Sequence, residues 1–361
     1  MPVPALPRLG LGCAPLANLY RAVTEEEAEA TVAAAFDTFG GAVTYLDTAP
    51  HYGLGRSEER LGRALAGRDR ASYLLSTKVG RRLRDLEPGE SPDGQGFVDS
   101  PARARVWDFS ADGIRATLDG SLTRLGVDRV DIVYLHDVED HLPEVYGGGF
   151  QALADLRDQG VVRAIGFGMN YSGVLARLVA DLDVDVVLCA GRWTLLERTA
   201  YDDLLPVCER RGTRVVVGGV YNSGLLADPR PDAHYNYAAA PQDVLKRAMD
   251  MAAVCGEFGV PLRAAALRFP FAHPSVVSAL VGAAGPAEVR DNAEMFGREI
   301  PDALWHALVG RGLLDEDVPL PLAGTVAAHA TAHAADQGAA HPAGPGASPA
   351  TTADPDRNTG E

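Results

Sequence analysis

The sequence predicts a single parallel (β/α)8 barrel, the TIM-barrel architecture, over residues 1–322, with an active site at the mouth formed by the carboxyl ends of its strands. Three observations favour this fold. Short runs rich in Val, Ile and Leu alternate along the chain with amphipathic segments. Most of these runs lack strict polar–apolar alternation, as strands covered on both faces do. No GxGxxG motif follows any run, which counts against the alternative of an open, doubly wound sheet.

The predicted elements follow one another in the order that a barrel requires. The strand-like runs cover residues 9–13, 43–48, 73–79, 130–136, 162–168, 184–190, 214–219 and 276–281. A capping box formed by Thr24 and Glu27 begins the first helix. Further helices are expected at residues 57–65, 111–125, 150–158, 173–180, 201–210, 244–258, 262–269, 287–296 and 302–309. Eight strands alternating with helices imply a closed barrel.

The composition narrows the range of partners. The chain has 361 residues, of which 47% are hydrophobic, and 49 acidic against 33 basic side chains give a net charge of −16. Such a surface repels phosphate backbones and anionic lipids, so we expect a small-molecule substrate and neither nucleic acid nor a membrane as a partner. The four cysteines form no CxxC pair, and no secretion signal is apparent. We therefore expect a cytoplasmic protein without a metal site, either monomeric or a small homo-oligomer.

The composition changes near the end of the chain. Residues 323–361 are rich in Ala, Pro, Gly and Thr and contain a single branched aliphatic residue, a valine. Such a segment buries too little apolar surface to offset the entropy lost on ordering. We therefore expect residues 323–361 to form a disordered tail.

Three ionisable residues end successive apolar strands. Asp47 ends TYLD, Lys78 ends YLLSTK and His136 ends DIVYLH. Taken singly, each residue also has a structural interpretation, as a turn cap, a surface charge or an interior histidine. Together they favour an active site, because the strand ends of a barrel point such groups into one mouth. Tyr52, in the loop DTAPHYG that follows Asp47, can lean over the same mouth.

These four side chains form a plausible acid–base set. A free phenol has a pKa of about 10, and a neighbouring ammonium group stabilises its phenolate form. Lys78 would stabilise the phenolate of Tyr52, Asp47 would hold Lys78 charged and oriented, and His136 would donate a hydrogen bond to the reacting oxygen. This arrangement needs neither a metal nor a covalent intermediate.

The chain resembles the aldo-keto reductase superfamily over about residues 9–313. The stretches that carry the resemblance are LDTAPHYGLGRSEERLGRAL, STKVG, LTRLGVDRVDIVYLHD and VVRAIGFGMN. The resemblance implies that Asp47, Tyr52, Lys78 and His136 are the catalytic tetrad. It also implies that hydride passes directly between nicotinamide C4 and the substrate carbon while the tyrosine handles the proton.

A narrower resemblance is to the bacterial aldose 1-dehydrogenases, which include D-threo-aldose and L-fucose dehydrogenases and pyridoxal-oxidising relatives. The stretches LGCAPLANLYRAV, VWDFSADGI, LCAGRWTLLE and GGVYNSGLLA carry it. It implies oxidation of an aldose hemiacetal carbon to a lactone. Three alternatives stay open: an NADPH-dependent aldehyde or ketone reductase, a tailoring enzyme of a secondary pathway, and a dinucleotide-binding regulatory subunit without turnover.

Glycine-rich segments after the seventh and eighth strands are expected to bind the dinucleotide, since barrels often hold phosphate there. In the first segment the expected contacts are Gly219, Val220, Tyr221, Asn222, Ser223, Gly224 and Leu225, through backbone N–H groups. The second segment adds Gly282 and Ala283, and the resemblance adds Asp47, Glu288 and Asn292. The Ser-Asn pair that holds the carboxamide in relatives reads Gly168-Met169 here, so Asn170 is expected to supply that contact.

The resemblance also bears on the choice of cofactor. Gly282 and Glu288 occupy the positions where NADPH-preferring relatives place a Lys and an Arg around the 2′-phosphate. A carboxylate repels that phosphate and can accept hydrogen bonds from a ribose diol. NAD is therefore favoured and NADP remains possible, because Arg290 lies close by in the sequence. An aromatic residue that stacks on the nicotinamide in relatives falls on Gly218, so Trp193 or Tyr221 is expected to replace it.

Loops at the mouth are expected to bind the substrate. Their candidate contacts are Asn18, Leu19, Tyr20, His51, Trp107, Arg192 and Trp193. The third loop, residues 81–109, is rich in Gly, Pro and charged residues, and we expect it to act as a lid.

Overall fold

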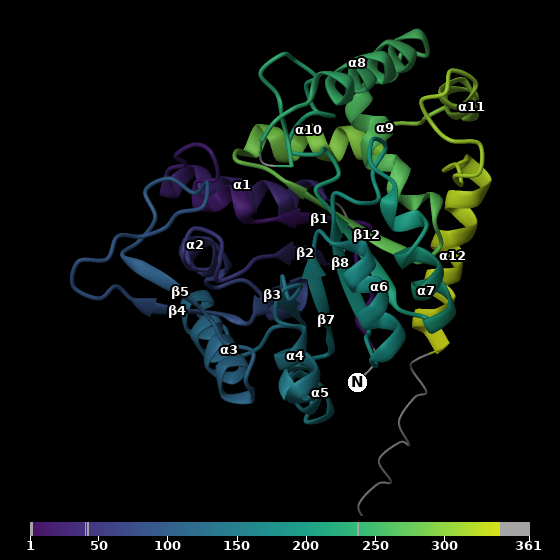
Figure 1. Ribbon diagram of the computed structural model, residues 1–361. Helices are drawn as coiled ribbons and strands as arrows, with labels where there is room; N and C mark the ends of the chain where they lie inside the picture. Colours follow the sequence, from purple (N-terminus) through teal and green to yellow (C-terminus); the bar gives the residue numbers. More distant parts are fainter. Residues whose placement is uncertain (1–2, 40, 42, 237, 340–361) are drawn as a thin grey trace, which may run out of the picture.

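In a computed structural model, which describes residues 3–39, 41, 43–236 and 238–339, the chain forms a closed barrel of parallel strands (Figure 1). The order of strands around the barrel is β1-β12-β9-β8-β7-β6-β3-β2, and β2 pairs with β1 to close it. The strands are β1 (Leu9–Gly12), β2 (Thr44–Asp47), β3 (Tyr73–Val79), β6 (Ile132–His136), β7 (Ala164–Met169), β8 (Val186–Ala190), β9 (Arg214–Gly218) and β12 (Val276–Gly282). The predicted fold class and each of the eight predicted strands are confirmed.

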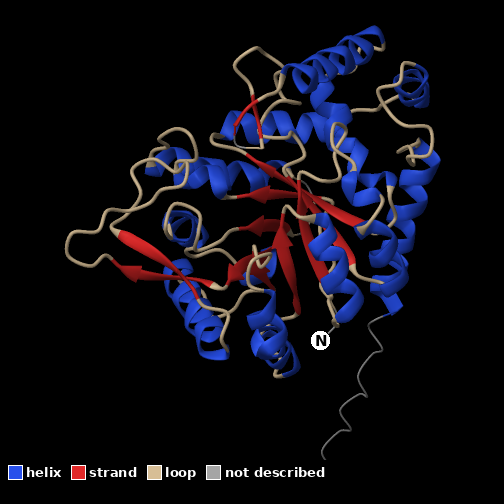
Figure 2. Ribbon diagram, viewed as in Figure 1, coloured by secondary structure: helices blue, strands red, loops and turns tan. Residues whose placement is uncertain are grey.

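Helices cover the outside of the barrel (Figure 2). They are α1 (Glu25–Thr38), α2 (Arg56–Leu65), α3 (Ala111–Leu125), α4 (Leu142–Glu144), α5 (Phe150–Asp158), α6 (Ser172–Asp181), α7 (Leu204–Arg211), α8 (Gln242–Glu257), α9 (Leu262–Arg268), α10 (Pro286–Gly297), α11 (Asp302–Gly310) and α12 (Ala323–Ala339). Thr24 caps α1 as predicted, accepting a hydrogen bond from the Glu27 N–H at 3.1 Å. Within the described ranges no helix is both long enough and apolar enough to cross a membrane.

The buried residues form two apolar clusters. The larger cluster fills the space between the strands and the helices. The smaller cluster includes Leu74, Ile132 and Val216 from β3, β6 and β9, together with two buried tyrosines, Tyr45 and Tyr134. The tyrosines place hydroxyl groups in an otherwise apolar environment, where they need hydrogen-bond partners.

The third loop contains regular structure that the sequence did not predict. Strands β4 (Arg81–Asp85) and β5 (Arg103–Trp107) form an antiparallel hairpin, which projects from the barrel beside α2 and α3 (Figure 1). RRLRD is dominated by arginine and shows no apolar alternation, while RARVW alternates arginine with Ala and Val over only four residues, which is a weak strand signal. A second hairpin, β10 (His234–Tyr235) with β11 (Ala238–Ala239), lies in the loop after β9.

The predicted boundary of the disordered tail at residue 323 is wrong for residues 323–339, which form α12. Alanine has the highest helix propensity, and the valine of this segment, Val326, is buried in the larger core cluster. His329 contacts the Phe271 carbonyl through Nδ1 at 3.3 Å. The remainder of the expected tail, residues 340–361, lies outside the described residues.

Candidate active site

Three adjacent strands bring Asp47, Lys78 and His136 to the same end of the barrel. Asp47 ends β2, Lys78 lies one residue before the end of β3, and His136 ends β6. Strand β3 pairs with β2 on one side and with β6 on the other. Tyr52, from the loop after β2, joins them: its ring centroid lies 6.0 Å from that of His136. The four predicted side chains are therefore gathered around one mouth.

The ammonium group of Lys78 uses all three of its donors within the protein. It donates to Asp47 Oδ1 at 2.6 Å, to the Thr48 carbonyl at 2.9 Å and to Tyr52 Oη at 2.9 Å. Lys78 is only 1% exposed. Burial acts to lower the pKa of Lys78, but the charge of Asp47 and the Tyr52 hydroxyl outweigh it and raise that pKa above its ordinary value. The lysine is therefore a fixed positive charge beside the phenol oxygen.

A chain of hydroxyl groups inside the barrel holds Asp47 in place. Ser76 Oγ donates to Asp47 Oδ2 at 2.6 Å and lies 3.0 Å from Tyr45 Oη, which lies 3.3 Å from Tyr134 Oη. Burial is the main cause that raises the pKa of both tyrosines, so both remain neutral donors. Asp47 thus has a partner for each carboxylate oxygen, and its orientation toward Lys78 is fixed. The sequence analysis did not include this chain of hydroxyl groups.

His136 is neutral near physiological pH. Burial, reinforced by Arg81 and Lys78, holds the pKa of His136 well below its usual range. A neutral imidazole carries one N–H donor and one acceptor nitrogen. Nδ1 of His136 is buried and has no partner among the described residues. The ring can therefore donate a hydrogen bond to an oxygen atom at the mouth without bringing in a second positive charge.

The comparisons with known proteins agree with this geometry. The model of the Aldo/keto reductase family matches residues 8–309. The chain belongs to this family. Members of the family use NAD(P)(H), so this aldo-keto reductase is an oxidoreductase that uses a nicotinamide dinucleotide.

Several relatives are similar over most of their length. The D-threo-aldose 1-dehydrogenase of a Pseudomonas species is 43% identical over 317 residues, which are 86% of this chain and 95% of that enzyme. The pyridoxal 4-dehydrogenase of Microbacterium luteolum is 36% identical over 85% of this chain and 94% of its own. Among solved structures, the holo form of an aldo-keto reductase from Bacillus halodurans has a TM-score of 0.65 and 25% identity, and covers 86% of this chain and 93% of its own.

The loop after β9 of this aldo-keto reductase has features that fit the phosphates of a dinucleotide. Gly219, Asn222, Ser223 and Gly224 all adopt left-handed backbone conformations, which are found in loops that bind anions through backbone N–H groups. The buried Nδ2 of Asn222 has no hydrogen-bond partner among the described residues. However, the N–H groups of Asn222, Gly224 and Leu225 already donate to carbonyls within the loop. The expectation that every N–H from Gly219 to Leu225 faces the cofactor is therefore wrong for these three residues.

The other residues expected to bind the cofactor border this loop. Tyr221 Oη donates to Asn292 Oδ1 at 2.8 Å, which joins the loop to α10. Val220 is buried, whereas Gly282 at the end of β12 is exposed and is followed by the buried Ala283. Asn170 follows β7 directly, and its carbonyl accepts a hydrogen bond from Arg192 Nε at 2.7 Å. Contact of these residues with a dinucleotide stays a prediction.

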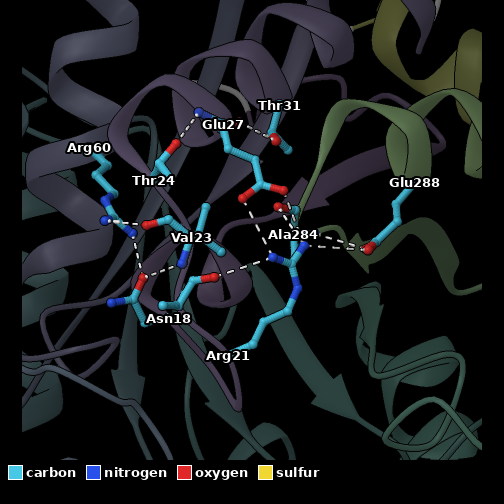
Figure 3. Close-up of polar contacts among 10 residues, drawn as sticks. Asn18, Arg21, Val23, Thr24, Glu27, Thr31, Arg60, Ala284 and Glu288 are labelled. Atoms are coloured by element: carbon cyan, nitrogen blue, oxygen red, sulfur yellow. Dashed lines mark hydrogen bonds and ion pairs between the residues drawn. The ribbon is translucent and has the colours of Figure 1, made fainter.

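Glu288 occupies the amino-terminal end of α10, as Figure 3 shows. Its Oε2 accepts a hydrogen bond from the Ala284 N–H at 2.9 Å, and its Oε1 lies 3.9 Å from Arg21 Nη2. Arg21 also donates to the Ala284 carbonyl and to Glu27. Glu288, Arg21 and Glu27 therefore form one connected set of charges at this end of α10.

The residues expected to bind the substrate divide into two groups. Tyr20, 50% exposed, stacks on His234 at 5.8 Å, and Trp107, 46% exposed, lies on β5 with the Arg81 guanidinium 4.3 Å from its ring. His51 lies at the mouth, 5.7 Å from His136 between ring centroids. Burial, assisted by nearby cationic side chains, lowers the pKa of His51 to about 2. Substrate contact by these three residues stays a prediction.

The position of Trp193 contradicts both roles expected for it, which were stacking on the nicotinamide and binding the substrate. It is completely buried, its Nε1 donates to the Pro270 carbonyl at 2.8 Å, and its ring packs against Phe269. The chain turns at Gly191, whose φ of 67° is left-handed, and Trp193 packs in the outer core. It can therefore reach neither the nicotinamide nor the substrate. Asn18 is also structural: it is 3% exposed, and its Oδ1 accepts hydrogen bonds from the Val23 N–H and from Arg60 (Figure 3).

The structure adds an ion pair to the mouth that the sequence analysis missed. Arg81, the first residue of β4, donates to Asp137, which directly follows His136. Asp137 Oδ2 lies 3.5 Å from His136 Nε2. Burial raises the pKa of Asp137, although Arg81 acts in the opposite direction. A carboxylate immediately after a strand-terminal histidine was a signal that could have identified it.

Proposed function

We propose that this aldo-keto reductase is an NAD-dependent aldose 1-dehydrogenase, which oxidises the hemiacetal carbon of an aldose to a lactone. The contact between Lys78 Nζ and Tyr52 Oη at 2.9 Å carries the reaction type, because it provides a phenol that can exchange a proton at the mouth. The substrate class follows from the likeness to the Pseudomonas D-threo-aldose 1-dehydrogenase over 95% of that enzyme.

Each side chain of the site has a separate role in the proposed reaction. Tyr52, as a phenolate stabilised by Lys78, accepts the proton of the hemiacetal hydroxyl. His136 donates a hydrogen bond to the same oxygen as it becomes a carbonyl. The bound dinucleotide supplies the hydride acceptor at nicotinamide C4. Asp47 keeps Lys78 charged and oriented, and Ser76 keeps Asp47 oriented.

Glu288 supports a preference for NAD over NADP. Its carboxylate already occupies the Ala284 N–H, and an added 2′-phosphate would meet its negative charge. A Glu288→Arg variant should bind the phosphorylated dinucleotide more tightly, with the ratio of the two dissociation constants changing by about tenfold or more. Quenching of protein fluorescence by each cofactor measures this ratio without turnover. An unchanged ratio would show that Glu288 does not face the ribose.

The substrate proposal is tested by measuring turnover with both cofactors. L-fucose and D-arabinose with NAD should give NADH and a lactone, identified by its hydrolysis to the aldonate. The matched reaction is reduction of simple aldehydes with NADPH, which should be slower. Faster aldehyde reduction with NADPH would overturn the proposal in favour of a reductase, and tight dinucleotide binding without any turnover would point to a regulatory subunit.

A further inference from the structure

Buried polar atoms without partners gather around the mouth. Within the described ranges, the atoms of this kind from the loops and strand ends at the mouth are His51 Nδ1, Arg81 Nε, Arg105 Nε, His136 Nδ1 and Glu139 Oε2. His51 lies 5.7 Å from His136 between ring centroids, and Arg81 donates to Asp137, the residue that follows His136. A buried polar atom left without a partner costs about 1–3 kcal/mol. A ligand with several hydroxyl groups, each both donor and acceptor, can satisfy such a set.

Asp137 lies beside the catalytic histidine, with its Oδ2 3.5 Å from His136 Nε2. It follows His136 and has a φ of 46°, a left-handed conformation that is uncommon for residues with a Cβ but tolerated by Asp. Such conformations concentrate at functional sites. Its Oδ2 accepts a hydrogen bond from Arg81 and lies 3.5 Å from His136 Nε2, whereas its Oδ1 has no partner among the described residues.

His136 and Asp137 place two polar groups side by side at the mouth. His136 Nε2 and Asp137 Oδ2 are 3.5 Å apart. A sugar likewise carries hydroxyl groups on adjacent carbons. If His136 contacts the oxygen on the reacting carbon, the adjacent hydroxyl group therefore falls beside the Asp137 carboxylate. A carboxylate is acceptor-only, so it selects a hydroxyl group at this position.

The hairpin of the third loop completes the surroundings. Arg81 holds Asp137 on one side, and its guanidinium lies 4.3 Å from the Trp107 ring on the other. Trp107 also lies 4.8 Å from His141 between ring centroids, so its plane is fixed. A separate cavity of about 380 Å³ lies within the hairpin and its connecting loop; its lining includes Arg81, Arg105 and Trp107 but neither Asp137 nor a residue of the tetrad.

We propose that Asp137, positioned by Arg81, is the specificity-determining residue that recognises the hydroxyl group on the carbon next to the reacting carbon. This inference rests on the proposed function, in which the substrate is a polyhydroxylated sugar. It extends that function by assigning to one carboxylate the discrimination between substrates with and without this hydroxyl group. The Arg81–Asp137 pair would otherwise serve only to anchor the β4–β5 hairpin.

The test compares two aldehydes of the same length in the reductive direction with NADH. Glyceraldehyde carries a hydroxyl group next to the reacting carbon, and 3-hydroxypropanal, which is otherwise identical, does not. Asp137→Ala should lower the ratio of kcat/KM for glyceraldehyde to that for 3-hydroxypropanal by about 30-fold, as expected for loss of a hydrogen bond to a charged group. Asp137→Asn, which keeps an acceptor oxygen but no charge, should lower the ratio by about fivefold.

A matched control lies at the opposite end of the same strand. Asp131 immediately precedes β6, is 3% exposed, and is also paired with an arginine, Arg70, at 2.6 Å. Asp131→Asn disturbs a comparable ion pair at the other end of the strand, so it should leave the ratio unchanged. A ratio that is also unchanged in the Asp137 variants would overturn the inference and leave the ion pair with a purely structural role.

The outcomes for this inference and for the proposed function are separable. If the wild-type protein discriminates glyceraldehyde from 3-hydroxypropanal through Asp137 but oxidises no aldose, the proposed function fails and the recognition by Asp137 stands. If aldoses are oxidised and the Asp137 variants keep the wild-type ratio, the proposed function stands and the recognition by Asp137 fails. Thermal unfolding of each variant shows whether a change reflects a loss of fold.

Discussion

The Asp47–Lys78 pair at the catalytic centre and the rim beside it differ in whether their buried polar atoms have partners, and His136 resembles the rim because its Nδ1 has none among the described residues. At the centre, Lys78 uses all three donors, and both oxygens of Asp47 have partners. At the rim, His51, Arg81 and Glu139 each keep a buried polar atom without a partner among the described residues. The centre is thus organised before any ligand arrives, whereas the rim is satisfied only by a ligand or by water.

This difference separates chemistry from recognition. Preorganised charges act on the transition state because no reorganisation is needed during the reaction. Unsatisfied groups at a binding site reject ligands that lack the matching hydrogen-bonding groups, since such ligands leave the buried atoms unpaired. We therefore expect substitutions at the centre to affect mainly kcat, and substitutions at the rim to affect selectivity.

Removing the charge at the centre should have the largest effect. Lys78→Met should lower kcat by about 10³-fold or more, because the proton transfer through Tyr52 loses its stabilising cation. It also leaves Asp47 as an uncompensated buried charge, which costs about 3–5 kcal/mol of stability. The double variant Asp47→Asn, Lys78→Met should recover much of the stability and none of the activity. Steady-state kinetics and urea unfolding measure the two effects, and recovery of activity in the double variant would contradict this account.

A substitution one step further from the mouth should have a smaller effect of the same kind. Ser76→Ala removes the 2.6 Å hydrogen bond to Asp47, so kcat should fall about tenfold while KM stays nearly unchanged. Ser278→Ala is the control, because Ser278 is an equally buried barrel serine whose hydroxyl donates to the Pro7 carbonyl instead. Equal losses in both variants would mean that Ser76 supports only the fold.

The burial of His51 at the rim should affect how the folding stability depends on pH. The pKa of His51 is lowered to about 2 by burial and by nearby positive charges. Below pH 6.5 the unfolded chain binds a proton at His51 that the folded chain does not. Folding stability therefore decreases as the pH is lowered, by up to about 1.4 kcal/mol per pH unit. His51→Gln removes this penalty. Its free energy of unfolding should therefore exceed that of the wild type by more at pH 5 than at pH 7.

The control for this measurement is His306, an exposed histidine on α11. His306→Gln should leave the slope of stability against pH unchanged between pH 7 and pH 5. Urea unfolding at a series of pH values gives the slopes. Parallel curves for His51→Gln and the wild type would show that the rim does not bury His51.

The barrel and the gathering of Asp47, Lys78 and His136 could be predicted from the sequence. Buried parallel strands appear in the sequence as uninterrupted apolar runs, so an ionisable residue at the end of such a run is easily recognised. The contact between Lys78 and Tyr52 follows from the same geometry, because the loop after β2 is short. None of this required knowledge of the side-chain packing.

The rest depended on packing that leaves little trace in the sequence. The arginine-rich strands of the β4–β5 hairpin are defined by their pairing with each other, not by an apolar pattern. Trp193 follows a strand like a mouth residue, yet the turn at Gly191 directs the chain into the outer core. The helix over residues 323–339 gains stability from the burial of one side chain, Val326, which composition alone does not reveal.

The most direct test of the central claim is the rate of hydride transfer in Tyr52→Phe, measured in a single turnover beside the affinity for NAD. The substitution removes one oxygen atom and leaves Lys78, Asp47 and the cofactor loops in place. We expect the transfer rate to fall by about 10³-fold or more, with the dissociation constant for NAD within about twofold of the wild type. A transfer rate within tenfold of the wild type would contradict the role of the Tyr52 hydroxyl as the proton carrier.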